Sequence, residues 1–214
     1  MRRGSGEDAR VAVVRLTRPA QRESATDEAS GRDRAEETWV LAAQRDPHAF
    51  APLYDRYAVP IYRFCYRKVG DVDLANDLTA QVFVKAIERI DRYQPRPGAS
   101  FKSWLFAIAR NTVTDAWRRQ KPTADVEPLM DVLIDDEPSP ERRAIEAEDQ
   151  VRVDRLLAYL PETQRTLVEL RLAGLTTKEL MATMHMSESA VKSAQHRAYH
   201  RLRDIVLATE GAGS

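Results

Sequence analysis

Apolar side chains recur at steps of three and four residues in one segment of this chain after another. The clearest run consists of Phe50, Leu53, Tyr54, Tyr57, Ile61, Phe64 and Cys65. This spacing gathers side chains on one face of an α-helix, whereas a half-buried β-strand needs them at alternate positions. Similar runs cover residues 74–90 and 101–117, and only 8 glycines interrupt the chain. The pattern predicts an all-α fold and argues against a β-sandwich or a β-barrel.

Short sequence signals mark where these helices are expected to begin and end. The dipeptide Asp46-Pro47 has the order of an N-cap followed by proline at the first helical position. Gly70 should end one helix, and Gln94–Gly98, with two prolines and a glycine, should separate two others. Ser100 is expected to cap the helix that follows. Pro60 should bend or split the helix in which it lies.

Composition divides the chain into four segments. Residues 1–35 lack apolar periodicity and are expected to be a disordered extension. Residues 36–121 are expected to form one small helical domain, and residues 141–209 a second one. Residues 122–140 contain four prolines and are typical of a flexible acidic linker. The formal net charge of zero hides this contrast, because residues 121–150 carry three basic and ten acidic side chains, a balance of −7.

The second domain contains the layout of a helix-turn-helix. Thr176 and Glu179 have the spacing of a capping box, His185 falls in the turn, and Ser187 is expected to cap the second helix. That helix carries the basic side chains Lys192, Arg197, Arg201 and Arg203. Such a helix can donate hydrogen bonds to phosphates and base edges in the major groove of DNA. An ordinary helical hairpin with a solvated basic face is the alternative that spacing alone leaves open.

Two histidines on the same helix raise the question of a metal. His196 and His200 are four residues apart and so share one side, a geometry that can hold zinc. The residue after His196 is Arg197, not the glutamate of a zinc protease, and no nearby cysteine or carboxylate cluster completes four ligands. We therefore predict neither a metal nor another cofactor. Because no phosphate loop, nucleophile elbow or carboxylate pair stands out, we expect no enzymatic activity.

The remaining singular residues fit a protein of the cytoplasm. Cys65 is the one cysteine, which excludes an internal disulfide, and its place on an apolar face predicts a core position. Trp104 is also expected in the core, whereas Trp117 could pack there or stack on bases. No apolar run approaches the roughly 20 residues that a membrane-spanning helix needs.

The two helical blocks resemble regions 2 and 4 of a bacterial sigma factor of the sigma-70 family, extracytoplasmic-function (ECF) group. In the first block the resemblance rests on DLTAQVFVKA at residues 77–86 and on FKSWLFAIARN at residues 101–111, continuing to Asp115 and Arg118-Arg119. In the second block it rests on Leu160-Pro161, Gln164-Arg165, Gly174–Thr176, Glu179-Leu180, Val191–Ser193 and His196–Ala198. Together the matched segments lie within residues 36–121 and 141–207.

The resemblance implies a factor that binds core RNA polymerase, directs it to specific promoters and promotes melting of the −10 region. It implies contacts with the clamp helices of the largest polymerase subunit and with the flap of the second-largest subunit. Promoter DNA and an anti-sigma factor are the other implied partners, without membrane insertion. The implied location is the cytoplasm, at the nucleoid when the factor is bound to polymerase. The acidic linker would then thread the polymerase cleft as a nucleic-acid mimic, or serve only as a tether.

The resemblance also implies roles for individual residues. It places polymerase binding at Asp77, Ala80, Gln81 and Phe83, with a core position for Phe83 left open as the alternative. It places binding of the −10 element at Lys85, Asn111, Arg118 and Arg119. Lys85 and Asn111 would line a pocket for a flipped base, and residues 93–100 would hold the melted strand. It places binding of the −35 element at Thr177, Lys178, Ser189, Lys192, Ser193, His196 and Arg197.

The chain departs from the family pattern at four positions in its expected polymerase and DNA contacts, and two other functions remain as alternatives. The family usually has glutamine at position 80, glutamate at 81, glycine at 185 and often arginine at 194, where this chain has Ala80, Gln81, His185 and Ala194. A stand-alone helix-turn-helix regulator would need no polymerase surface and would bind its operator by itself. A metal-dependent hydrolase would rest on the histidine pair alone.

Overall fold

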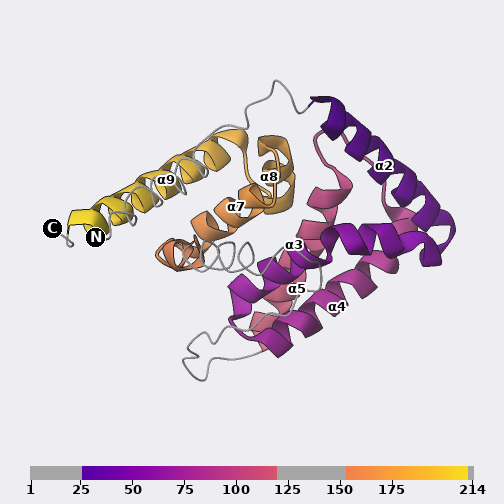
Figure 1. The fold of residues 1–214 in the computed structure, drawn as a ribbon, viewed down its shortest axis with the longest axis horizontal. Coiled ribbons are helices and arrows are strands. Elements are labelled where there is room, and N and C mark those ends of the chain that lie inside the picture. Colours follow the sequence, from indigo (N-terminus) through magenta and orange to yellow (C-terminus); the bar gives the residue numbers. More distant parts are fainter. Residues whose placement is uncertain (1–25, 120–152, 212–214) are drawn as a thin grey trace, which may run out of the picture. The chain divides into compact units, whose positions relative to one another are not determined.

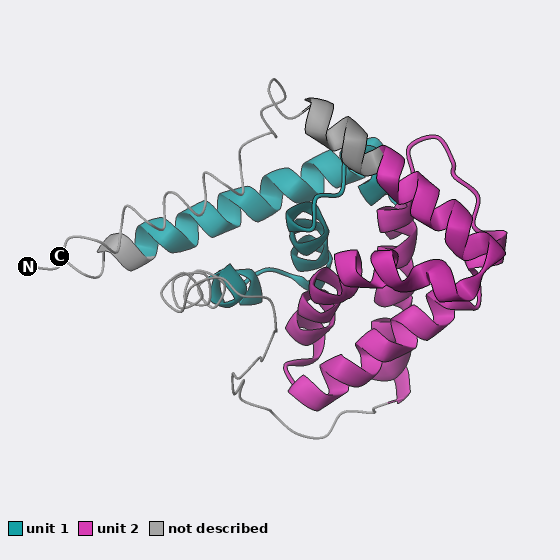
Figure 2. Ribbon diagram, turned by 45° about the vertical axis from the view of Figure 1, so that its right-hand side comes forward, with its two compact units in different colours: residues 1–21, 135–181, 185–214 teal, residues 22–134, 182–184 magenta. Residues whose placement is uncertain are grey.

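The computed structural model describes residues 26–119 and 153–211, which form two compact units (Figures 1 and 2). Within these ranges the chain forms helices and one isolated bridge between Arg96 and Ala99, and no β-strand. The predicted all-α class is therefore confirmed. The predicted linker, residues 122–140, lies outside the described residues. None of the described helices is both long and apolar enough to cross a bilayer.

The first unit along the chain, magenta in Figure 2, contains four α-helices and two short 3-10 helices in its described residues. They are α2 (Thr26–Arg45), η1 (Pro47–Phe50), α3 (Ala51–Val69), α4 (Val72–Ile87), η2 (Ile90–Arg92) and α5 (Phe101–Arg119). Helices α3, α4 and α5 pack on one another, and α2 packs on both 3-10 helices. The core between them is rich in aromatic rings, and Phe64 and Phe106 meet edge to face with centroids 5.7 Å apart.

Most of the predicted helix boundaries in this unit are confirmed. The side chain of Asp46 accepts a hydrogen bond from the backbone of His48 at the start of η1. Gly70 ends α3 with φ +69°, a left-handed conformation that glycine adopts without a Cβ penalty. Ser100 Oγ accepts from the backbone N–H of Ser103 and so caps α5. These local capping contacts explain why the boundaries could be predicted from sequence.

Two expectations for this unit are corrected. Helix α2 begins at Thr26, inside the segment 1–35 that was expected to be disordered. A helix whose first turns are polar on every side leaves no apolar periodicity for a sequence analysis to detect. Helix α3 runs through Pro60 as one helix, so the split that was one of the two expected outcomes does not occur.

A buried carboxylate joins α2 to α3. Glu36 is 8% exposed, accepts a hydrogen bond from the hydroxyl of Tyr57, and forms an ion pair with Arg56 at 3.3 Å. Burial, together with the hydrogen bond to the Glu36 carboxylate, raises the pKa of Tyr57. The phenol therefore stays a donor at any physiological pH, and the contact stabilises α2 on the rest of the unit.

The second unit contains α7 (Glu162–Leu172), α8 (Thr177–Met184) and α9 (Glu188–Gly211), preceded by a helical stretch at residues 153–158. Its core includes the aliphatic cluster Leu157, Leu160, Val168, Ala198 and Leu202, between α7, α9 and the preceding stretch. Arg165 donates to the carbonyl oxygens of Leu157 at 3.0 Å and Ala158 at 2.7 Å. Its guanidinium thereby adds donors to the carbonyls at the end of this helical stretch, where that of Leu157 also accepts from the backbone N–H of Leu160.

Candidate functional site

Helix α4 carries an exposed stripe that contains most of the predicted polymerase contacts. Asp77, Ala80 and Gln81 are exposed, and Val84 continues the same row with 54% of its surface accessible. Ile87, at the end of the helix, is 37% exposed. Sequence analysis missed Val84 and Ile87. Helix phase could have revealed Val84, because a residue three positions after Gln81 falls outside the buried face. We call residues 77, 80, 81, 84 and 87 the α4 stripe.

The predicted polymerase contact Phe83 is corrected to a core residue. It is 4% exposed, and its ring lies 4.7 Å from that of Tyr54 and 6.3 Å from that of Phe50, between centroids. Six residues separate it from Asp77, which turns the helix by roughly 600° and leaves the two side chains about 120° apart. Phe83 therefore supports α4 from behind the exposed stripe.

Helices α4 and α5 meet where a base pocket was predicted. Lys85 Nζ donates to Thr112 Oγ1 at 3.0 Å, across 27 residues of sequence. Asn111, the next residue before Thr112, is exposed. The fold thus brings Lys85 to the expected turn of α5, but its hydrogen-bond partner is the hydroxyl of Thr112 and not the amide of Asn111.

The end of α5 presents one aromatic and two basic side chains to solvent. Trp117 is 57% exposed, and Arg118 and Arg119 beside it are exposed as well. Arg118 approaches Asp115 at 3.8 Å, a long and mostly solvated ion pair. Trp104 instead packs against Tyr93, with ring centroids 5.1 Å apart. Trp104, expected in the core, is half-buried at its edge, and the exposed ring of Trp117 leaves open that it stacks on a partner.

The loop between η2 and α5 is held by a residue that sequence analysis did not single out. Gln44 of α2 donates through Nε2 to the carbonyl oxygens of Ile90, at 3.1 Å, and Tyr93, at 2.6 Å. The loop then turns at Gly98, where φ is +81°, and the bridge between Arg96 and Ala99 closes it. Gln44 lies 46 and 49 residues before its partners, so no local pattern could have revealed it.

The predicted helix-turn-helix is present in the second unit. Thr176 and Glu179 form both hydrogen bonds of a capping box at the start of α8. His185 ends α8 with φ +55°, a left-handed conformation in which a residue with a side chain is uncommon. Ser187 Oγ then accepts from the backbone N–H of Ala190 and caps α9. The turn therefore forms although the chain has histidine where the family usually has glycine.

The residues predicted to read duplex DNA lie at the surface of this motif. Exposed positions are Lys178, Ser189, Lys192, Ser193, His196 and Arg197, and Thr177 is half-buried. Lys192 forms an ion pair with Glu188 at 2.6 Å. The hydrogen bond from Lys192, with its positive charge, lowers the pKa of Glu188, so this carboxylate is ionised at neutral pH. An anion thus stands among the basic side chains at the start of α9.

Other chemistry-bearing residues are placed without a catalytic arrangement. Cys65 is fully buried, and burial raises the pKa of its thiol to about 12, so the side chain acts as an apolar core residue. Within residues 26–119 and 153–211, no three residues among His, Cys, Asp and Glu are grouped so as to hold a metal ion. His196 and His200 do lie together, with their Nε2 atoms 3.0 Å apart.

Comparisons with known proteins match both units. Residues 53–123 match the family "Sigma-70 region 2", and residues 150–202 match "Sigma-70, region 4". The chain is 33% identical over 162 residues to the ECF RNA polymerase sigma factor BldN of Streptomyces coelicolor, covering 74% of this chain and 60% of that protein. It is 36% identical over 188 residues to the ECF RNA polymerase sigma factor ShbA of Streptomyces griseus, covering 80% of this chain and 98% of that protein.

A solved structure shares the fold. The structure of CnrH in complex with the cytosolic domain of CnrY is similar with a TM-score of 0.60 and 23% sequence identity, over 81% of this chain and 98% of that one. Two family regions in their expected order, and relatives that match across both, agree with the geometry of the two units. The chain belongs to the extracytoplasmic-function group of the sigma-70 family of RNA polymerase sigma factors.

Proposed function

We propose that this protein binds core RNA polymerase, directs it to specific promoters and opens the −10 region. The observation that carries this proposal is the pair of separate surfaces: an exposed stripe and aromatic-basic helix end in the region 2 unit, and a capped helix-turn-helix in the region 4 unit. A stand-alone regulator would need only the second of them. We assign residues 36–121 and 141–209 to these two functional domains.

The α4 stripe is the proposed docking surface for the clamp helices of the largest polymerase subunit. Asp77 and Gln81 would supply polar contacts, and Ala80 leaves room for close approach. Val84 and Ile87 would add apolar area, which contributes about 25 cal/mol for each Å² removed from water. Phe83 has no direct part in this surface, because its ring is buried behind it.

The face between α4 and α5 and the end of α5 are the proposed surface for the melted −10 strand. Lys85 and Asn111 would bind the edge of an unpaired base, and Arg118 and Arg119 would contact phosphates. Trp117 offers a ring on which a base can stack, an interaction worth about 1–3 kcal/mol per base. Gln44 fixes the base of the neighbouring loop, so the loop can present a constant shape to the strand.

Helix α9 is the proposed reader of the −35 element in duplex form. Its first two turns, with α8 alongside, would enter the major groove and place polar side chains against base edges and phosphates. The contributing residues are Thr177, Lys178, Ser189, Lys192, Ser193, His196 and Arg197. The flap of the second-largest polymerase subunit is the proposed protein partner of this unit.

Regulation by an anti-sigma factor is proposed on the family membership. The exposed apolar residues of the region 2 unit, including Leu41, Tyr54 and Val84, offer contact area to such a protein as well as to polymerase. These activities would take place in the cytoplasm, at the nucleoid when the holoenzyme is assembled.

Run-off transcription with purified core polymerase and a genomic promoter library tests the proposed function. We expect transcripts that depend on this protein, and their start points identify the promoter. Asp77→Arg should abolish these transcripts and reduce co-purification with core polymerase while the helical circular-dichroism signal is kept. Specific operator binding by the protein alone, with no transcripts in the presence of core polymerase, would favour the stand-alone regulator.

A further inference from the structure

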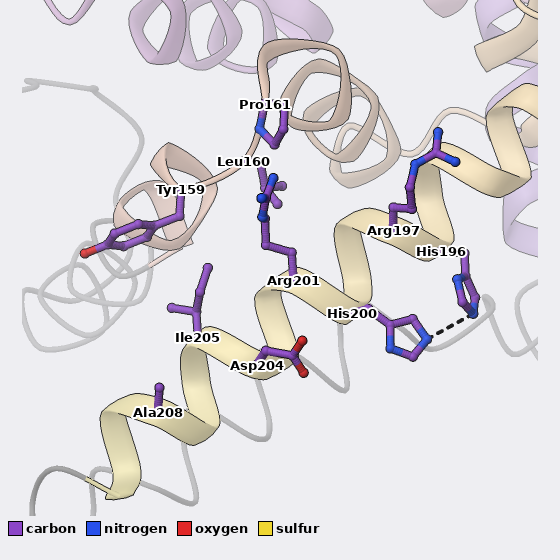
Figure 3. A pocket seen from close by; sticks show the side chains of 10 residues that line it. All are labelled: Tyr159, Leu160, Pro161, His196, Arg197, His200, Arg201, Asp204, Ile205 and Ala208. Atoms are coloured by element: carbon purple, nitrogen blue, oxygen red, sulfur yellow. Dashed lines mark hydrogen bonds between the residues drawn. The ribbon is translucent and has the colours of Figure 1, made fainter.

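The imidazoles of His196, one of the proposed −35 contacts, and His200 lie together on one side of α9 (Figure 3). Both side chains are exposed, and their Nε2 atoms are 3.0 Å apart, joined by a hydrogen bond. His200 belongs to none of the surfaces assigned above. The four-residue spacing on a regular helix holds both rings on the same side without any support from a distant segment.

The distances between the two rings match those of two ligands on one metal ion. Imidazole nitrogens about 2.0–2.1 Å from an ion, and about 90° apart as in square-planar or octahedral sites, lie roughly 2.9 Å from each other. Their ring centroids then lie about 4.5 Å apart in the same geometry. The observed values are 3.0 Å between nitrogens and 4.2 Å between centroids. Little side-chain movement therefore separates the hydrogen-bonded pair from a chelating pair.

The surroundings leave room for an ion and for further ligands. Both histidines line an open hollow of about 900 Å³, so a hydrated ion can reach them. One turn farther along α9, Asp204 is exposed and paired with Arg203 at 3.2 Å. The neighbouring cations Arg197 and Arg201 oppose the approach of a positive ion, which limits affinity. A four-ligand structural zinc site is absent from the described residues, but a two-ligand site requires only the histidine pair.

The sequence-based expectation of no metal rested on the lack of four ligands. From the geometry of the pair we propose that His196 and His200 form a bidentate site for one divalent transition-metal ion that favours imidazole, such as Cu²⁺, Ni²⁺ or Zn²⁺. Water fills the remaining coordination positions. On binding, the ion replaces the hydrogen between the two Nε2 atoms, and the donating ring carries its hydrogen on Nδ1 instead. Among these ions Cu²⁺ should bind most tightly, in accordance with the general order of affinities. The site does not depend on the proposed promoter function.

Titration of the full chain with Cu²⁺ tests the site. The protein must carry no affinity tag, because added histidines would bind the probe. Calorimetry gives the affinity and stoichiometry, and electron paramagnetic resonance reports the number of nitrogen ligands. The test variants are His196→Gln and His200→Gln, both at exposed helical positions that tolerate glutamine. The matched control replaces the other two histidines, as His48→Gln together with His185→Asn, since asparagine tolerates the left-handed conformation at 185.

We expect one ion per chain with two nitrogen ligands in the wild type and in the His48/His185 control. Each single variant at 196 or 200 should show one nitrogen ligand and an affinity at least about tenfold weaker, which corresponds to about 1.4 kcal/mol. Circular dichroism checks that the variants stay helical. Equal affinity in the wild type and the two single variants, or loss of binding in the control instead, would overturn the proposal.

Discussion

The two units differ in how their candidate surfaces are held in place. In the region 2 unit the decisive contacts join distant parts of the chain: Gln44 reaches Ile90 across 46 residues, and Lys85 reaches Thr112 across 27. In the region 4 unit the contacts at the surface are local, because the Thr176–Glu179 box and the Glu188–Lys192 pair span three and four residues. The first surface therefore depends on the whole fold of its unit, and the second mainly on its own helix ends.

The cores show the same contrast. Rings of Phe50, Phe64, Phe83, Phe101 and Phe106 meet between the helices of the first unit. In the second unit the cluster around Leu157 and Leu202 is aliphatic and includes the small residue Ala198. Large rings make contacts with several helices at once, so that one substitution disturbs the whole unit. A small aliphatic core with strong caps tolerates changes at its helix ends.

The largest effect is expected from Phe106→Ala. Phe106 is fully buried and packs edge-on against Phe64, and removal of a buried phenylalanine ring costs about 3–5 kcal/mol of stability. Hydrogen exchange of the full chain should show lost protection across α3, α4 and α5. Leu202→Ala is the matched core change, and its loss should concentrate in α7 and α9. Identical exchange maps for the two variants would contradict the contrast between separate cores.

Substitution of Gln44 should loosen a loop that is far away in the sequence. Gln44→Ala removes two hydrogen bonds to the loop, those to the carbonyls of Ile90 and Tyr93, at about 0.5–1.5 kcal/mol each. The carbonyl of Ile90 keeps the backbone N–H of Tyr93 as a donor. Amides of residues 93–100 should exchange faster, although no residue of the loop has changed. The control is Gln94→Ala, an exposed position on the loop itself. If the control has the larger effect, the loop is not held by Gln44.

Loss of the capping box should have a smaller and purely local effect. Thr176→Ala removes the acceptor for the backbone N–H of Glu179, which costs about 0.5–2 kcal/mol. Faster exchange should be confined to the first turn of α8. Thr177→Ala, one position later, changes a threonine that is not the cap and should have little effect on exchange. Faster exchange across the whole of α9 would contradict this expectation, because it would show that the capping box stabilises more of the second unit than its own helix end.

The smallest effect on stability is expected from Glu188→Gln. This ion pair with Lys192 is exposed and screened by solvent, so its loss should change stability least of all. Binding to duplex promoter DNA should nevertheless become tighter, because the change removes a negative charge from the proposed −35 face and frees Lys192 for phosphate. Fluorescence anisotropy at several salt concentrations measures this, with Lys192→Gln as the opposite control. Unchanged or weaker binding by Glu188→Gln would place Lys192 outside the DNA contact.

The contrast between local and long-range contacts also explains which features could be predicted from the sequence. Capping residues such as Asp46, Ser100 and Thr176 bond within three residues of themselves, so their signals are visible in the sequence and the helix boundaries were predicted well. The role of Gln44 was invisible, because its partners are distant. Thr26 was missed as a helix start because a polar helix has no apolar stripe.

The candidate site residues follow the same division. The predicted surface positions on α9 are exposed, since helix phase alone fixes which side they occupy. Helix phase also explains why Phe83 is buried although Asp77 is exposed. A step of six residues does not return to the same side of a helix. Val84 was missed because apolar periodicity identifies only the buried face of α4, and Val84 lies outside that face. Lys85 was placed against α5, but only the fold reveals that Thr112 receives its hydrogen bond.

The central claim is that separate surfaces serve −10 melting and −35 recognition. Permanganate footprinting of the −10 thymines in polymerase complexes, on duplex and pre-melted promoters, tests it most directly. Asn111→Ala should lower reactivity on duplex DNA, recover only part of it on the bubble, and leave −35 binding unchanged. Arg197→Ala should weaken promoter binding by about 1–3 kcal/mol if it reads a base. Equal thymine reactivity on duplex DNA for the wild type and Asn111→Ala would contradict the account.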